Sequence, residues 1–293
     1  MTNHRFPLFF KWRNCNFPQK SLQDSKCVTR CVSSVPGKDR KVNQGCIFEA
    51  PCEKRKMVIH KLIAQHLRNR DDATFYAFQA QDAIKWIESA KWPGRTGNKA
   101  LDLGCGHGIF GRELKERGWN VTFSDETNTL LPELRSAPFI DANIDAGGLA
   151  KLGQYDLVVC SNVLEHLAEP DKFLGSAQSL LTPSGRLYLS WTNWLSPWGG
   201  HEFSPFHYLG PRAGYKLYDS LVKRKRNHTP FVNLFPTYIG SILRKIRKNP
   251  DLLIVRMAPR YYTELPWILR IPVLREFLTW NCALLIERRS RSN

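Results

Sequence analysis

The stretch Leu101-Asp-Leu-Gly-Cys-Gly-His-Gly-Ile-Phe-Gly111 leads from an apolar strand through a glycine-rich turn into the start of a helix. Its glycines at 104, 106 and 108 can adopt positive φ angles and let a ligand approach the backbone closely. The free N–H groups that open the following helix point at whatever is bound there. The stretch therefore predicts the first strand, turn and helix of an α/β fold that binds a nucleotide cofactor.

Strand and helix patterns alternate along the rest of the chain. Apolar runs predict strands at 100–103, 119–124, 139–140, 155–160, 186–191, 252–257 and 282–286. Helical periodicity covers 58–90, 109–117, 127–134 and 171–181, and it recurs at 215–222 and 239–248. Strands separated by helices require a parallel sheet with right-handed crossovers. The expected fold class is therefore α/β, with a doubly wound sheet.

Two cofactors fit the glycines, and the register of the turn distinguishes them. Gly106-x-Gly108-x-x-Gly111, with Asp125 about 20 residues on, matches the dinucleotide fingerprint. The strand runs directly into Gly104, however, so that fingerprint fits only when it is shifted by two positions. The carboxylate of Asp102 would also repel a pyrophosphate, whereas it suits an ammonium group such as the amino-acid end of S-adenosylmethionine.

Two further segments follow the turn, Val121-Thr-Phe-Ser-Asp125 and Tyr155-Asp-Leu-Val-Val-Cys-Ser-Asn-Val-Leu-Glu-His-Leu167. Together with Asp102-x-Gly104-x-Gly106-x-Gly108 they resemble the class I S-adenosylmethionine-dependent methyltransferases. The resemblance covers roughly Phe75 to the C-terminus and is closest to the small-molecule, type 11/12-like group. It implies a Rossmann-like, seven-stranded sheet that is mostly parallel, with the last strand antiparallel. It is specific for the cofactor and says little about the acceptor.

The resemblance also implies which residues contact the cofactor: Asp102, Gly104, Cys105, Gly106, Gly108, Asp125, Glu126, Asn143, Ile144, Ser161 and Asn162. Asp125 should accept hydrogen bonds from the two ribose hydroxyls, and residues 143–144 should lie near adenine. Residues 161–162 should face the methionine portion. Two alternatives remain open: Asp125 as a helix cap and Asn143 as the residue of a local turn.

Candidate catalytic residues follow the fourth and fifth predicted strands. Methyl transfer needs a positioned acceptor, and a base only if the acceptor must lose a proton. His166 follows the fourth strand, while His201 and His207 lie in an aromatic stretch after the fifth, so these three histidines are the candidate bases.

A divalent cation is a second possibility at the same place. Glu165, His166 and His201 partly resemble the metal site of ubiquinone-pathway O-methyltransferases and small-RNA 2′-O-methyltransferases. Asn162 stands where a further acid would be expected, although two imidazoles and one carboxylate can hold a metal ion. The alternative without a metal is that His166 orients its loop and His201 caps a turn.

Charge and composition set expectations about domains and partners. The formal net charge of +17 favours anionic partners. Residues 1–56 are basic and lack periodicity, so we expect a disordered extension before a methyltransferase domain at 57–293, in which an insert at 192–250 covers the active site. The basic stretches 223–226 and 239–248 fit an anionic membrane surface, RNA phosphates or a solvated helix face.

The predicted function is methyl transfer from S-adenosylmethionine to a small-molecule or lipid-like acceptor, most simply O-methylation. The alternatives are an RNA methyltransferase and a non-catalytic partner protein that binds the cofactor. No apolar run reaches the ~18–20 residues of a membrane span, and the first residues lack a secretory apolar region. A cytoplasmic location, with peripheral contact to a membrane as an option, is therefore expected.

Overall fold

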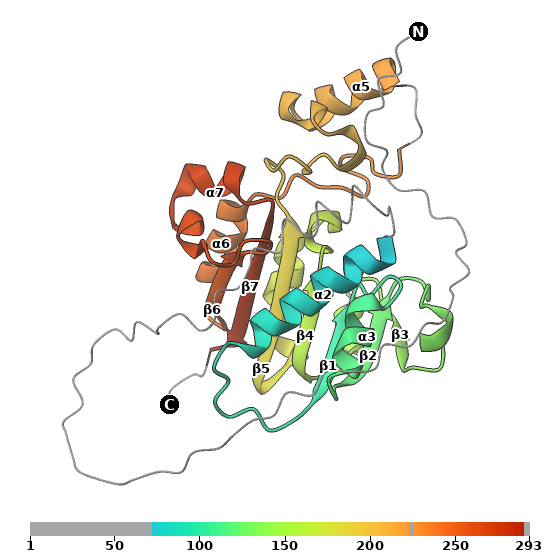
Figure 1. Cartoon of the computed structure of the whole chain (residues 1–293), viewed down its shortest axis with the longest axis vertical. Helices are drawn as coiled ribbons and strands as arrows, with labels where there is room; N and C mark the ends of the chain where they lie inside the picture. Colours follow the sequence, from blue (N-terminus) through green and yellow to red (C-terminus); the bar gives the residue numbers. More distant parts are fainter. Residues whose placement is uncertain (1–71, 223–225, 290–293) are drawn as a thin grey trace, which may run out of the picture. The chain divides into compact units, whose positions relative to one another are not determined.

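The computed structural model describes residues 72–222 and 226–289, all of which belong to the compact unit Lys56–Asn293 (Figure 1). The predicted extension at 1–56, the start of the first predicted helix and most of the basic run 223–226 lie outside the described residues. The strands are β1 (Lys99–Leu103), β2 (Asn120–Asp125), β3 (Phe139–Asp141), β4 (Tyr155–Ser161), β5 (Leu181–Thr192), β6 (Leu252–Pro259) and β7 (Asn281–Arg288).

The seven strands form one sheet in the order β3-β2-β1-β4-β5-β7-β6. Every neighbouring pair from β3 to β5 is parallel, and β7 runs antiparallel between β5 and β6. The predicted fold class, including the antiparallel last strand, is confirmed. The strand order reverses between β1 and β4, and ligands of doubly wound sheets bind at the carboxyl ends of the strands beside that reversal.

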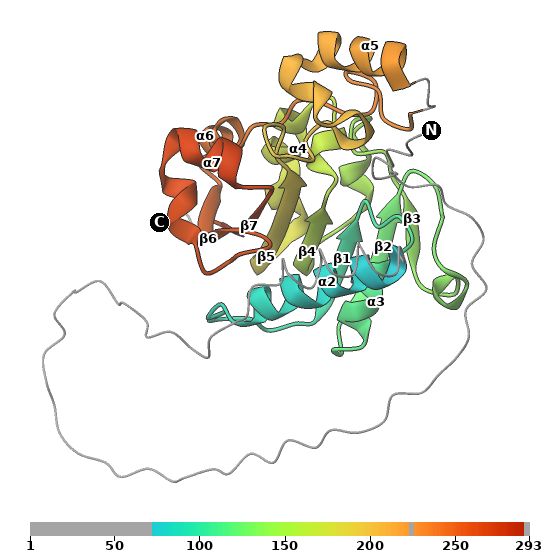
Figure 2. The same cartoon turned by 45° about the horizontal axis from the view of Figure 1, so that its top comes forward.

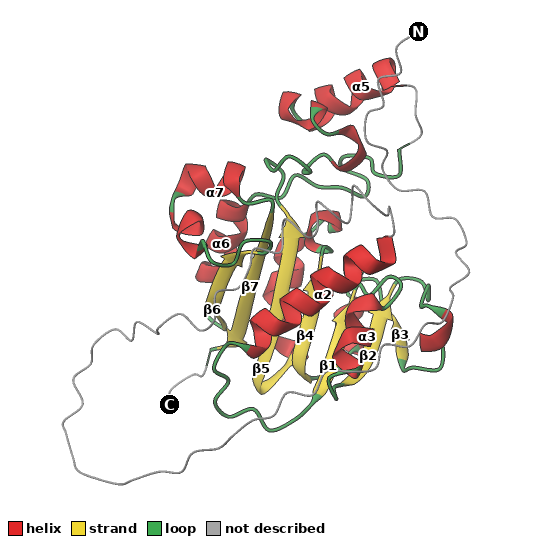
Figure 3. Cartoon of the chain, in the orientation of Figure 1, coloured by secondary structure: helices red, strands yellow, loops and turns green. Residues whose placement is uncertain are grey.

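Helices cover both faces of the sheet (Figures 2 and 3). On one face, α2 (Asp72–Glu88) and α3 (Ile109–Lys115) share a buried cluster with Phe123 and Tyr188. On the other, α4 (Pro170–Ser176) and α6 (Ile239–Lys248) share a second cluster with Trp191. Each interior strand therefore buries side chains on both faces, which explains its almost unbroken apolar sequence.

Three local expectations differ from the structure. The helix expected at 127–134 is only a 3-10 turn, Pro132–Leu134. Pro132 lacks the N–H that a longer helix would need to bond the carbonyl four residues earlier. The helix expected at 171–181 is divided into α4 and a 3-10 helix, Ala177–Leu180. Residues 182–185, between the predicted helix and the strand predicted at 186–191, lie inside β5 as an irregularity. Leu181 pairs with Tyr155, and pairing resumes at Arg186 with Leu157.

The insert that follows β5 is shorter than the 192–250 predicted. Its two ends meet where the Trp194 N–H donates to the Thr237 carbonyl at 3.0 Å. Between them lie two 3-10 helices, His201–Phe203 and Phe206–Leu209, and α5 (Pro211–Val222), which lies beyond the end of the sheet at which β5 ends (Figures 1 and 2). Trp194, Phe203, Tyr218 and Leu234 form the small core of this insert.

The basic helix α6 does not belong to the insert. Its apolar residues Ile239, Ile242, Leu243 and Ile246 are buried against the sheet. Of the three alternatives left open for 239–248, insertion of its apolar residues into a membrane is excluded, because those residues are buried in the core. Among the described residues, no helix combines the length and apolar character needed to cross a membrane.

Candidate active site

The glycine loop leaves β1 with three residues in the left-handed region, Gly104, Gly106 and Gly108, at φ +69°, +49° and +77°. A Cβ at Gly104 would lie 2.3 Å from Val163, and one at Gly108 would lie 2.6 Å from Leu130. A Cβ at Gly106 would meet no atom within 4 Å. Gly104 and Gly108 are thus required by packing as well as by φ, while the backbone at Gly106 borders open space that a ligand can enter.

Asp125, the last residue of β2, holds the loop in this position. Its Oδ2 accepts from the Gly106 N–H at 2.7 Å, and its Oδ1 accepts from the Glu126 N–H at 2.8 Å. Each carboxylate oxygen has capacity for a second hydrogen bond. The side chain is therefore placed beside the open part of the loop and keeps acceptor capacity for a ligand.

Asp102 has a role that the sequence did not predict. Its carboxyl group is buried, and its Oδ2 accepts from the Gly111 N–H of α3 at 2.8 Å. Burial, together with the charge of Asp125, outweighs the hydrogen bond from Gly111 and raises the pKa of this carboxyl to about 7. The group expected to face an ammonium ion is turned under α3, where it ties β1 to that helix.

The residues expected near adenine form a local turn. The Asn143 Oδ1 accepts from the Ala146 N–H at 2.8 Å, as the turn alternative proposed. Ile144 packs, partly buried, against the core cluster on the α4 side of the sheet. Cys105 in the glycine loop is half-buried, and burial raises the pKa of its thiol well above the usual range.

The carboxyl end of β4 leads into a polar network that includes a buried arginine. Asn162, at φ 58°, accepts through Oδ1 from Asn281 Nδ2 at 2.8 Å and from Arg260 Nη1 at 3.2 Å. Ser161 Oγ accepts from Ser190 Oγ at 3.2 Å. Arg260 is 3% exposed, its Nε has no hydrogen-bond partner, and no acidic side chain in the described ranges forms an ion pair with it. A buried guanidinium without a counter-ion at this edge suits an anionic ligand group.

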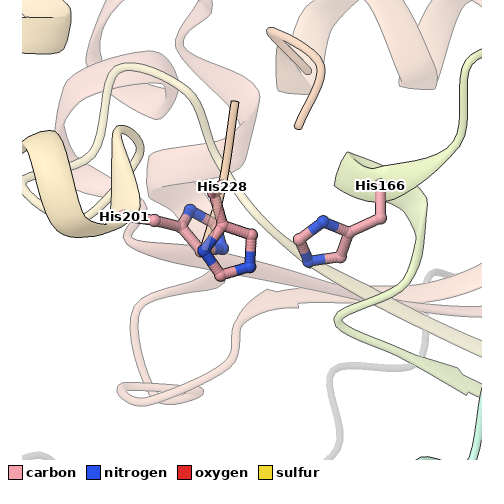
Figure 4. A group of neighbouring side chains, drawn as sticks. All are labelled: His166, His201 and His228. Carbon is pink, nitrogen blue, oxygen red and sulfur yellow. The ribbon is translucent and has the colours of Figure 1, made fainter. Parts of the chain in front are cut away.

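Three histidines from separate segments meet near the same edge (Figure 4). His166 ends the 3-10 helix after β4, His201 begins the one after β5, and His228 lies in the loop after α5. The ring centroids are 5.4 Å apart for His166–His201, 5.3 Å for His166–His228 and 4.5 Å for His201–His228. One ring nitrogen of each lies within 4.8 Å of the others, which is a spacing that can hold a metal ion.

Two of these rings are held by outer hydrogen bonds. His166 Nδ1 lies 2.7 Å from the Asn233 carbonyl, and His228 Nδ1 lies 2.8 Å from Glu202 Oε2. Burial, with two imidazole neighbours, lowers the pKa of His201 to about 3. His201 is therefore a neutral ring near pH 7 and a weak base, because a base with so low a pKa accepts a proton poorly.

Glu165 does not face this cluster as a ligand, so its predicted metal role is wrong. It is 2% exposed, and its Oε1 accepts from the Thr192 N–H at 2.9 Å. Its backbone carbonyl accepts from the Phe235 N–H at 2.7 Å. Glu165 thus fixes both ends of the insert to the loop that carries His166, and His228 takes the place that the sequence assigned to the carboxylate.

The structure also contradicts the prediction that His207 is a candidate base. It is fully buried, its Nε2 lies 3.0 Å from the Ser196 carbonyl, and its ring packs edge-on against Trp194 with centroids 5.6 Å apart. Burial lowers its pKa. A histidine enclosed in the core of the insert has no path to an acceptor, so it stabilises the insert and is not a base.

Comparison of the chain with known proteins identifies its family. A family model described as a methyltransferase domain matches residues 75–224. An uncharacterized methyltransferase of Mycobacterium bovis (strain BCG / Pasteur 1173P2) is 32% identical over 233 residues, which cover 74% of this chain and 89% of that protein. One of Mycolicibacterium vanbaalenii is 30% identical over 228 residues, or 73% and 87% of the two chains. The chain belongs to the class I S-adenosylmethionine-dependent methyltransferases.

Two solved methyltransferases resemble this chain at lower identity. An S-adenosylmethionine-dependent methyltransferase of Mesorhizobium loti is 20% identical, with a TM-score of 0.45 over 67% of this chain and 93% of its own. Magnesium protoporphyrin IX methyltransferase of Synechocystis PCC 6803, solved with bound SAH, is 19% identical, with a TM-score of 0.45 over 74% and 86%. Both likenesses are too distant to bear on the acceptor.

In this methyltransferase, the cofactor contacts predicted for the glycine loop and Asp125 stay predictions, and the sequence did not single out His228 or Arg260. The structure brings His166 and His201 together as predicted and leaves Glu165 and His207 buried elsewhere. The sequence did contain signals for both missed residues. Arg260 directly follows an apolar strand, and His228 follows the basic run after α5.

Proposed function

We propose that this methyltransferase transfers a methyl group from S-adenosylmethionine to a hydroxyl oxygen of a small-molecule or lipid-like acceptor. One observation carries the proposal: β1 and β4 are parallel neighbours, so the glycine loop after β1 and the segment with His166 after β4 leave the same edge of the sheet. Val163, three residues before His166, packs directly against Gly104. The segment that carries His166 therefore begins beside the loop that would hold the methyl donor.

The loop residues fit the proposed cofactor. Open space borders the Gly106 backbone, and the Asp125 carboxylate lies 2.7 Å from the Gly106 nitrogen. An acceptor-only group beside accessible backbone suits a ribose with two hydroxyl donors. We assign the ribose to Asp125, adenine to Asn143 and Ile144, and the methionine portion to Ser161 and Asn162. When bound, the cofactor supplies an electrophilic methyl carbon attached to a sulfonium.

Arg260 adds a charge to this assignment. It shares the Asn162 amide oxygen with Asn281, and it is buried without a carboxylate partner among the described residues. An arginine fork binds a carboxylate in a fixed geometry. We assign Arg260 to the carboxylate at the amino-acid end of the cofactor. The sequence had suggested no positively charged residue for that group.

The remaining task of the chain is to align a hydroxyl with the methyl carbon and to remove its proton. Alignment alone lowers the barrier of a bimolecular step by several kcal/mol, roughly 7–11 in favourable cases. We assign His166 and His201 to the acceptor side. His166 is the candidate for the proton, since His201 accepts a proton poorly and His207 is enclosed.

The surface of the insert favours an apolar acceptor. Large apolar side chains on α5 and the loop after it are exposed: Leu217, Leu221, Val222, Phe231 and Val232. Exposed apolar groups that gather on one segment commonly mark a binding surface. Because α5 lies beyond the carboxyl end of β5, these groups favour a lipid-like molecule or a lipid surface that presents the acceptor.

Labelling with S-adenosylmethionine that carries a radioactive methyl group tests the proposal. Cell extract is divided into lipid, small-molecule, RNA and protein fractions, and each fraction is incubated with the full chain. We expect label in the lipid or small-molecule fraction, in a bond that survives mild alkali as an ether does. The Asp125→Ala variant should transfer little or none.

The other outcomes identify the alternatives. Label in RNA would replace the proposal with RNA methylation. Tight cofactor binding without label in any fraction would favour a non-catalytic partner protein. Label on a nitrogen or carbon atom of the acceptor would retain methyl transfer and reject O-methylation.

A further inference from the structure

We propose that His166, His201 and His228 form a centre for one divalent transition-metal ion, with zinc the best fit. The site itself stands on the geometry of these side chains. Its role in catalysis, which is to hold the acceptor hydroxyl, rests on the function proposed above. The carboxylate that the sequence offered as a ligand, Glu165, is not part of the centre.

The hydrogen bonds of His166 and His228 leave one ring nitrogen of each free to bind a metal ion. A carbonyl or carboxylate oxygen can only accept, so the Nδ1 atoms of His166 and His228 must donate to Asn233 and Glu202. In the neutral rings this leaves Nε2 as the atom with a free lone pair. Metal-binding histidines almost always donate their other ring N–H to a carbonyl or carboxylate in this way.

His201 supplies the third ligand from a tightly built turn. Its φ is 49°, a left-handed conformation that non-glycine residues adopt rarely. A Cβ on Gly199 would lie 1.8 Å from the Trp194 carbonyl, and one on Gly200 would lie 2.6 Å from His207, so both glycines are needed to place the ring. Its Nδ1 is buried and has no hydrogen-bond partner. Strained residues held by their surroundings cluster at binding sites.

The supports of the cluster are linked to one another. Glu202, the residue after His201, also accepts from the Asn227 N–H at 3.1 Å beside His228. The loop that carries His228 is closed by Asn233, whose Oδ1 accepts from the Thr229 N–H at 2.7 Å and whose carbonyl receives His166. One carboxylate and one asparagine thus fix all three ligand segments together.

The donor set selects the ion. Three imidazoles without a carboxylate suit zinc and its neighbours, whereas magnesium and calcium prefer oxygen ligands. Nitrogen ligands around tetrahedral zinc stand about 3.4 Å apart, since each Zn–N bond is about 2.0–2.1 Å. The ligand atoms here lie within 4.8 Å of one another, so small side-chain rotations close the triangle. Three protein ligands leave the fourth position open, as in catalytic zinc sites.

That open position gives the centre its chemistry. An acceptor hydroxyl bound there loses its proton to water more readily, because the cation stabilises the negative oxygen. The oxygen then forms a bond to the methyl carbon, and the carbon–sulfur bond breaks with its electron pair moving to sulfur.

Metal binding to the full chain, measured apart from activity, tests the centre. The protein is freed of any affinity tag, dialysed against EDTA and treated with iodoacetamide, because five cysteines before residue 60 are potential ligands of their own. Calorimetric titration with Zn²⁺ should show one ion per chain. Co²⁺ should give the visible absorption of a tetrahedral site without a thiolate charge-transfer band.

Variants assign the ion to the cluster. His166→Ala and His228→Ala should abolish the single site, while Glu202→Gln should weaken it roughly 10- to 100-fold as an outer-shell change. The matched control is His107→Ala, which removes an imidazole outside the cluster and should leave Zn²⁺ affinity unchanged. The circular dichroism spectrum and thermal midpoint of each variant in the absence of metal confirm that it is folded, a readout independent of the glycine loop in which His107 lies.

Three results overturn the centre: absence of zinc binding to the wild-type chain, equal affinity in the wild-type and His228→Ala proteins, or a thiolate spectrum with Co²⁺. Failure of the proposed function looks different. Zinc bound by the histidines with no methyl transfer to any hydroxyl would sustain the centre and reject O-methylation. Undiminished O-methyl transfer after EDTA treatment, with no zinc bound, would sustain O-methylation and reject the metal centre.

Discussion

At the scale of single residues, Asp125 connects the fold to the cofactor. It holds the Gly106 N–H at 2.7 Å and keeps lone pairs free toward the open side of the loop. Hydrogen bonds to a charged acceptor are worth about 1.5–3 kcal/mol each. We therefore expect Asp125→Ala to weaken S-adenosylmethionine binding roughly 10- to 100-fold in a calorimetric titration. Asp141→Ala, which removes an exposed carboxylate from the end of β3, is the matched control. Unchanged affinity in Asp125→Ala would mean that another residue receives the ribose.

Arg260 has no acidic partner among residues 72–222 and 226–289, so a bound anion is the expected counter-charge. Arg260→Gln should raise the Kd for S-adenosylmethionine roughly tenfold. The affinity for adenosine, which has no carboxylate, should stay nearly the same. An equal loss of affinity for both ligands would show that Arg260 supports the site only through packing.

Asp102 makes the stability of the protein depend on pH. Its pKa is raised by burial from 3.8 to about 7, so the folded state binds more protons than the unfolded state between these values. Stability governed by this group therefore falls as the pH rises from about 4 to about 7. Asp102→Asn, which keeps an oxygen for the Gly111 N–H, should gain roughly 2–4 kcal/mol relative to wild type between pH 5 and pH 8. A denaturant titration at both pH values measures this gain, and a constant difference would contradict it.

At the scale of elements, the two amphipathic helices near the C-terminal half have opposite roles. The apolar residues of α6 are buried against the sheet, whereas Leu217 and Leu221 of α5 are 39% and 63% exposed. The sequence alone predicted helical periodicity at 215–222 and at 239–248. Only the position of each helix relative to the sheet decides which apolar face is free.

Replacing the exposed leucines tests the role of α5. Leu217→Glu with Leu221→Glu should change the free energy of unfolding by less than about 0.5 kcal/mol, as surface substitutions do. Transfer to a lipid-like acceptor should fall severalfold, because the apolar surface is lost. Leu253→Glu on β6 changes a leucine of similar exposure, 43%, outside the insert and should leave transfer unchanged. Equal transfer by both proteins would remove α5 from the acceptor site.

At the scale of the whole molecule, the histidine centre joins the sheet to the insert. His166 belongs to the loop after β4, and His201 and His228 belong to the two arms of the insert. An ion that binds the folded chain stabilises it by RT ln(1 + [L]/Kd), or about 2.7 kcal/mol at one hundred times Kd. Zn²⁺ should therefore raise the thermal midpoint of the metal-free protein by several degrees, and it should not raise that of His166→Ala.

The sequence by itself determined the order of strands and helices, the glycine loop and the position of Asp125. These features follow from local patterns: apolar runs report burial on both faces of a parallel sheet, and glycines report positive φ. The antiparallel last strand and the cofactor came from the family resemblance carried by the same motifs.

The tertiary structure alone decided which side chains meet. Asp102 and Glu165 lie in motifs that the sequence identified, yet each carboxyl is turned into the interior by the element packed over it. His228 joins His166 only because the insert folds back over the end of β4, a contact between segments far apart in the chain. Local sequence patterns indicate which residues of a segment are buried and which backbone conformation the segment adopts. The partners of a loop side chain depend on how distant segments pack, and that is fixed only when the whole chain is folded.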